Sequence, residues 1–141
     1  MLFGMTDTKE APVLFTPWST VHFLSGMGAT ALFAVFINNE KLVVVITNIL
    51  HILYELFDFL GDNAPWFKPF HDSIYRIAKV PEDKQYLWSN SLLNSVGDLI
   101  SFALGQLVVL KYFNHIKIPV VVVVAILIFV IFTNATLMTL D

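Results

Sequence analysis

Residues 48–58 read N-I-L-H-I-L-Y-E-L-F-D and lie within an apolar segment that extends over 42–60. Four polar side chains recur there at helical steps of three, four and three residues: Asn48, His51, Glu55 and Asp58. On a helix these steps place all four on one face, within a stripe about 100° wide. Because a carboxylate near the middle of a bilayer costs about 2.5–3.5 kcal/mol on insertion scales, we expect the function to depend on this stripe.

The composition is typical of a polytopic membrane protein. The chain has 141 residues, of which 57% are hydrophobic and 13% charged, whereas about 25% of the residues in a soluble domain are charged. Long apolar runs with this charge deficit predict several membrane-spanning helices. The net charge of −3 and the lack of a basic stripe argue against nucleic acid as a partner. Because there is no cysteine, disulfides, thiolate metal sites and cysteine nucleophiles are excluded.

Hydropathy predicts a single all-α domain, residues 1–141, built as a bundle of four transmembrane helices. The spans are expected at 18–37, 42–60, 92–112 and 118–140, each close to the roughly 20 residues that a helix needs to cross a bilayer. Short polar turns join the first span to the second and the third to the fourth, so these pairs should be antiparallel neighbours. Between spans two and three, segment 66–79 has the apolar spacing of a short amphipathic helix lying in the membrane interface.

The distribution of basic residues gives a prediction of orientation. Four spans place both termini on one side of the membrane. That side would carry Lys9, Lys68, Arg76, Lys79 and Lys84, whereas the other would carry Lys41, Lys111 and Lys117. By the positive-inside rule the termini are then cytoplasmic, in a bacterial inner membrane or an organelle membrane.

Polar side chains of all four spans are predicted to share the half of the bilayer next to the termini. His22 and Asp58 lie near the membrane face of the termini, Glu55 lies one turn deeper with Asp98 at a depth comparable to Glu55, and His51 is nearer the middle. Asn48 and Asn134 are expected to give polar support. The simplest arrangement is a cavity that opens toward the termini and is lined by His22, His51, Glu55, Asp58, Asn94 and Asp98.

Three kinds of chemistry fit these residue types. Histidine and carboxylate side chains are ligands for divalent metal ions such as Zn²⁺. The same groups could relay protons or bind a cation, or bond one another across helices as structural contacts. The spacing H-x3-E-x2-D puts ligands at i and i+4 on one helix, but it matches no known catalytic signature. The candidate metal ligands are His22, His51, Glu55, Asp58 and Asp98.

These chemistries lead to three hypotheses of function. The first is a metal- or proton-dependent activity on a membrane lipid or small amphiphile, with Glu55 and Asp98 as catalytic groups. The second is a proton or cation pathway. The third is a non-catalytic accessory subunit that binds other membrane subunits in a larger complex. The sequence leaves open whether the chain is an enzyme.

Residues 91–105, S-L-L-N-S-V-G-D-L-I-S-F-A-L-G, closely resemble the third-span signature of a small uncharacterised family of bacterial inner-membrane proteins, S-x-L-N-S-V-G-D-x-x-x-x-x-L-G. The resemblance covers most of 16–140, and the chain is more distantly similar to the VanZ-like membrane bundles. It implies a bacterial inner-membrane protein without implying a particular activity. Further matches are H-x3-G at His22 and Gly26, D-x3-R at Asp72 and Arg76, and N-x-T-L starting at Asn134.

The chain departs from the family pattern at polar positions. His51 stands where the family has an acid, Ser25 where it has a second histidine, and Asn90 where it has another acid. Phe132 lies near the position of a family arginine. The resemblance therefore implies fewer charged groups in this chain, which favours the accessory-subunit hypothesis over catalysis.

Overall fold

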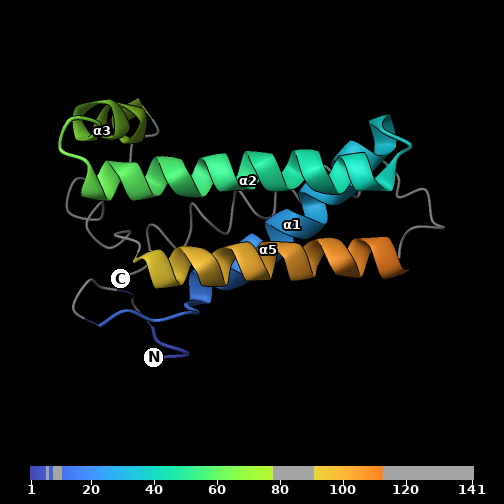
Figure 1. Ribbon diagram of the computed structural model, residues 1–141, viewed down its shortest axis with the longest axis horizontal. Coiled ribbons are helices and arrows are strands. Elements are labelled where there is room, and N and C mark those ends of the chain that lie inside the picture. Colours follow the sequence, from blue (N-terminus) through green and yellow to red (C-terminus); the bar gives the residue numbers. More distant parts are fainter. Residues whose placement is uncertain (6, 8–10, 78–90, 113–141) are drawn as a thin grey trace.

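The computed structural model describes residues 1–5, 7, 11–77 and 91–112, which form a bundle of helices (Figure 1). The helices are α1 (Pro17–Phe36), α2 (Glu40–Asn63), α3 (Lys68–Ile77) and α5 (Leu92–Tyr112). In α1, α2 and α5, apolar stretches of 20, 22 and 21 residues are long enough to cross a membrane. The prediction of an all-α chain with long apolar helices is confirmed for the described residues. The predicted fourth span, 118–140, and Asn134 within it lie outside them.

Helix α2 is longer than the predicted span 42–60. It begins at Glu40 because the side chain of Asn39 caps it, accepting a hydrogen bond from the backbone N–H of Leu42 at 3.2 Å. It continues through Gly61, which lies just beyond the predicted end of the span, and ends at Asn63. A Cβ atom at Gly61 would overlap the imidazole ring of His71 in α3. Gly61 therefore serves close packing between α2 and α3 rather than helix termination.

Helices α1 and α5 run in the same direction and make the most extensive helix contact among the described residues. Two glycines allow this approach. A Cβ atom at Gly26 would overlap the backbone carbonyl of Phe102, and one at Gly105 would overlap that of Phe23. Small residues let helix backbones touch in this way in membrane proteins. The predicted neighbours, α1 and α2, do contact each other, but less extensively.

Helix α2 lies side by side with α5, and α1 crosses the pair obliquely (Figure 1). A polar network joins α2 to α5. The Nε2 group of Gln106 donates to Thr47 Oγ1 at 2.6 Å, and Asn48 Nδ2 donates to Gln106 Oε1 at 2.8 Å. Helix α3 lies at the C-terminal end of α2, where it packs against α2 (Figure 1).

The bundle has polar groups inside and apolar groups outside. Four of its five largest fully buried side chains are polar, and α2 exposes a row of apolar side chains that includes Ile49, Leu53 and Leu56. A protein surrounded by water has the opposite distribution, because burial of apolar surface drives its folding. The arrangement is the one expected when hydrocarbon surrounds the helices. The fully buried side chains are Val43, Asn94, Thr30, Thr47 and Asp98.

The N-terminal segment folds against the start of α5. The backbone N–H groups of Leu14 and Phe15 donate to residues 1 and 2, and the Phe3 and Phe15 rings stack with centroids 5.4 Å apart. The buried carboxylate of Asp7 accepts hydrogen bonds from Val13 N at 2.8 Å and from the side chain of Ser91 at 2.9 Å. These contacts fix the segment beside the beginnings of α1 and α5.

Candidate functional site

Four titratable side chains from three helices meet inside the bundle. Helix α1 supplies His22, α2 supplies His51 and Glu55, and α5 supplies Asp98. Oxygen Oε1 of Glu55 lies 3.4 Å from His22 Nδ1 and 3.6 Å from His51 Nε2. The other ring nitrogen of His22, Nε2, lies 3.6 Å from Asp98 Oδ2. His22 thus stands between two carboxylates that belong to different helices.

The site is enclosed, and part of it lacks hydrogen bonds. Exposed fractions are 7% for His51, 4% for Glu55 and 1% for Asp98. Among the described residues, His51 Nε2 and both carboxylate oxygens of Glu55 have no hydrogen-bond partner. A buried polar group left without a partner costs about 1–3 kcal/mol, and more when it is charged. These unbonded groups are therefore candidates for binding a cation.

Aromatic packing fixes the imidazole rings. The ring of His51 stacks on Phe102 with centroids 4.0 Å apart and an interplanar angle of 11°. The His22 and His51 rings lie 5.1 Å apart, and the Tyr54 ring lies 6.1 Å from each of them. Phe102 is only 3% exposed, and α1 holds it in place because its carbonyl contacts Gly26. The close contact of α1 and α5 therefore also orients His51.

Asp98 is held by a hydrogen bond that crosses the contact between α1 and α5. The hydroxyl of Ser19 donates to Asp98 Oδ1 at 2.6 Å, and it accepts a hydrogen bond from the backbone N–H of Thr16 at 3.2 Å. The His51 side chain also contacts the backbone of Asp98. Sequence reasoning missed Ser19, because a serine in the first turn of a helix is ordinary at a helix start. Its position one turn before His22 was the available signal.

Three of the four side chains have the spacing of metal ligands. Each of His22, His51 and Glu55 offers a ligand atom, and the three atoms lie within 4.8 Å of one another. Zinc lies about 2.0–2.2 Å from nitrogen and oxygen ligands, so neighbouring ligands of a tetrahedral site lie about 3.3–3.6 Å apart. The separations of 3.4 and 3.6 Å around Glu55 Oε1 match that range. Asp98 lies outside this group and faces the far nitrogen of His22.

The structure places the other predicted side chains in separate contacts. Asp58, one turn beyond Glu55, faces His71 of α3, with Oδ1 at 3.7 Å from Nε2. Asn94 donates to the carbonyl of Leu14 at 3.3 Å, and Asn48 belongs to the Gln106 network. The polar stripe of α2 therefore meets α5, α1 and α3 in turn along its length.

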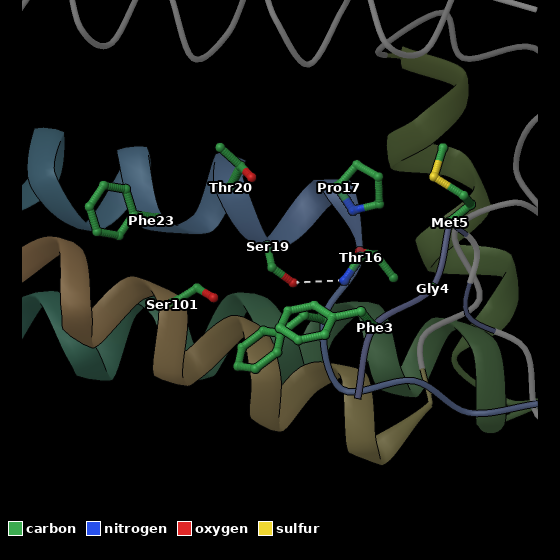
Figure 2. Close-up of a pocket in the computed structure, with 10 residues that line it drawn as sticks. Phe3, Gly4, Met5, Thr16, Pro17, Ser19, Thr20, Phe23 and Ser101 are labelled. Carbon is green, nitrogen blue, oxygen red and sulfur yellow. Dashed lines mark hydrogen bonds between the residues drawn. The ribbon is translucent and has the colours of Figure 1, made fainter. Parts of the chain in front are cut away.

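A cavity of about 700 Å³ lies beside the beginning of α1 (Figure 2). Phe3, Phe15 and Phe23 supply aromatic walls, and hydroxyl groups come from Ser19 and Ser101. The two histidines and two carboxylates of the site are not among its lining residues. Ser19 connects them, because it lines the cavity and also bonds to Asp98.

No family model, curated protein or solved structure matches the chain. The resemblance to an uncharacterised inner-membrane family accordingly stays a prediction. Inferences about function rest on the geometry of the site.

Proposed function

We propose that this chain is a multi-span membrane protein that binds a divalent metal ion, of the chemical class of Zn²⁺, through His22, His51 and Glu55. One observation carries the proposal. Two imidazole nitrogens and a carboxylate oxygen from two helices converge at ligand spacing, and the His51 nitrogen and the carboxylate lack hydrogen-bond partners among the described residues. A cation bound between them would satisfy all three atoms.

The ligand set also favours a class of activity. Among the described residues three protein ligands converge, which leaves a fourth position for water or substrate, as in catalytic zinc sites, whereas structural zinc sites use four protein ligands. A metal ion in that setting activates water or polarises a carbonyl or phosphoryl oxygen. We therefore propose hydrolysis of, or transfer to, a membrane lipid or small amphiphile. Glu55 acts as a ligand, and Asp98 acts on His22 from outside the ligand group.

The placement in the membrane is part of the proposal. Segment 118–140 forms a fourth span, and both termini lie on the cytoplasmic side of a bacterial inner membrane or an organelle membrane. Helix α3 lies in the interface, because Phe70, Ile74 and Ile77 are exposed apolar residues on a short helix that also carries Lys68 and Arg76.

A second candidate function is a proton or cation pathway. It is favoured by the unbroken series of contacts from Ser19 through Asp98 and His22 to Glu55 and His51. Uptake of protons or cations into vesicles that contain the purified protein would favour this candidate. If gentle extraction instead yields a larger assembly with no metal bound, the chain is better explained as an accessory subunit.

Metal binding by the purified protein tests the proposal. We expect about one Zn²⁺ or Co²⁺ per chain, and a visible Co²⁺ absorption band of tetrahedral type. Glu55→Gln should weaken binding by more than about 100-fold, because loss of an outer-shell partner alone costs 10–100-fold. Glu40→Gln, which removes the exposed acid at the start of α2, is the matched control and should bind as the native chain does. Absence of stoichiometric binding by the native chain would contradict the proposal.

A further inference from the structure

We propose that Asp98 and Ser19 are positioning residues that select one tautomer of His22, with the proton on Nε2 and a free electron pair on Nδ1. The consequence for metal binding rests on the proposed function. The tautomer itself is a property of the metal-free protein, so it can be measured separately.

The direction of the Ser19 hydroxyl is fixed by its two partners. The backbone N–H of Thr16 donates to Ser19 Oγ at 3.2 Å, so this oxygen already accepts one hydrogen bond. The Ser19 proton is then free to be donated to Asp98 Oδ1, and the distance of 2.6 Å is that of a strong hydrogen bond to a carboxylate. Ser19 is only 5% exposed, so water has little access to this pair.

The second oxygen of Asp98 then determines which nitrogen of His22 is protonated. With Oδ1 bonded to Ser19, Oδ2 faces His22 Nε2 at 3.6 Å. This separation exceeds a hydrogen bond, so the carboxylate acts on the ring as a directed negative charge. A neutral imidazole carries one N–H and one electron pair. An N–H pointing toward the carboxylate is attracted, whereas an electron pair pointing there is repelled.

This tautomer creates a position for a cation. With its proton on Nε2, His22 presents the electron pair of Nδ1 to Glu55 Oε1, 3.4 Å away. Two acceptor atoms at that distance repel each other unless a proton or a metal ion lies between them. Metal-bound histidines in proteins generally donate their other ring N–H to a carboxylate, carbonyl or water, which sets the tautomer in the same way. The arrangement of His22 between Glu55 and Asp98 has that form.

The framework around these residues is rigid. Ser19 and His22 lie on α1 and Asp98 lies on α5, so the positioning contact crosses the interface where Gly26 and Gly105 bring the two backbones together. A site on closely packed helices keeps its geometry better than a site on loops. Ser19 also lines the cavity of Figure 2, so the positioning pair lies beside that cavity.

The experiment is ¹⁵N solid-state NMR on metal-free protein with labelled histidine in lipid bilayers, with His22→Gln used to assign the signals of His22. We expect the native chain to show the Nε2-protonated tautomer. Asp98→Asn presents an amide donor as well as an acceptor and should increase the Nδ1-protonated form. Ser19→Ala should give a smaller change in the same direction, and Ser19→Thr, which keeps the hydroxyl, should restore the native signal. Asp72→Asn, a substitution on α3 beside His71, should leave the signals of His22 unchanged.

Metal affinity is the second measurement. Asp98→Asn should weaken Co²⁺ binding by about 10–100-fold and alter the Co²⁺ absorption band. Ser19→Ala should weaken binding by about 10-fold or less. A native His22 protonated on Nδ1, or a tautomer unchanged in both Asp98→Asn and Ser19→Ala, overturns the inference. If the native chain shows the expected tautomer but binds no metal, the proposed function fails and the positioning role stands. Should Asp98→Asn fail to fold, the comparison of Ser19→Ala with Ser19→Thr decides the question.

Discussion

At the scale of single residues, the polar side chains inside the bundle differ in how completely they are bonded. Gln106 uses both ends of its amide, donating to Thr47 and accepting from Asn48. Asp98 has one oxygen bonded to Ser19. Glu55 has neither oxygen bonded among the described residues, although it is as deeply buried as Gln106. Gln106 is therefore a structural contact between helices, whereas the unbonded carboxylate of Glu55 is what the proposed metal site would explain.

This difference predicts opposite effects of one substitution at the two positions. Gln106→Met should destabilise the metal-free protein by about 1–3 kcal/mol, because Thr47 and Asn48 each lose a buried partner. Glu55→Met should leave the stability unchanged or raise it by a similar amount, since it removes an unbonded carboxylate and fills the space with an apolar side chain. Thermal unfolding in detergent with a chelator present measures both. Equal destabilisation by both variants would mean that Glu55 is a structural contact like Gln106.

At the scale of helices, the sequence predicts the bounds of the helices better than it predicts which helices pack most closely together. Span 92–112 agrees with α5, because the length and composition of an apolar run set where a helix can cross a bilayer. The pairing rule based on short turns predicted α1 and α2 as antiparallel neighbours, and these helices do contact each other. The contact of α1 with α5 is more extensive, because Gly26 and Gly105 admit the opposing backbone and no such glycine pair joins α1 to α2 in the described part of the chain.

The glycine contact gives a prediction for the helix pair. Gly26→Ala and Gly105→Ala should each destabilise the bundle by about 1–3 kcal/mol, because a methyl group would overlap a backbone carbonyl of the other helix. Since Phe102 and the His51 ring stacked on it would also shift, metal affinity should fall with stability. Ala34→Val adds more volume at an exposed position of α1 and is the control. If both glycine variants melt at the native temperature, α1 and α5 can move apart to admit a methyl group with little loss of stability, which would contradict the prediction.

At the scale of the whole molecule, the sequence predicted where the site lies better than it predicted which residues form it. Counting residues from the ends of the spans places Glu55 and Asp98 at similar depth and His22 one turn nearer the membrane face, and the structure brings these three together with His51. Asp58 meets α3 instead, because nothing in the sequence shows where a short helix will pack. Ser19 was missed for a related reason, since its role arises only from the parallel approach of α1 and α5.

The orientation of the bundle in the membrane can be tested directly, because the chain contains no cysteine and single cysteines can be introduced without background labelling. Lys41 is exposed near the N-terminal end of α2, and Lys111 is exposed near the C-terminal end of α5. Asn63, also exposed, is the last residue of α2. If all three long helices cross the bilayer, a membrane-impermeant maleimide should label Lys41→Cys and Lys111→Cys from one side and Asn63→Cys from the other. The four-span prediction adds that Asp141→Cys is labelled from the side of Asn63. Labelling of Lys41→Cys and Asn63→Cys from the same side would show that α2 does not span, and the His/carboxylate site would then lie outside the hydrocarbon.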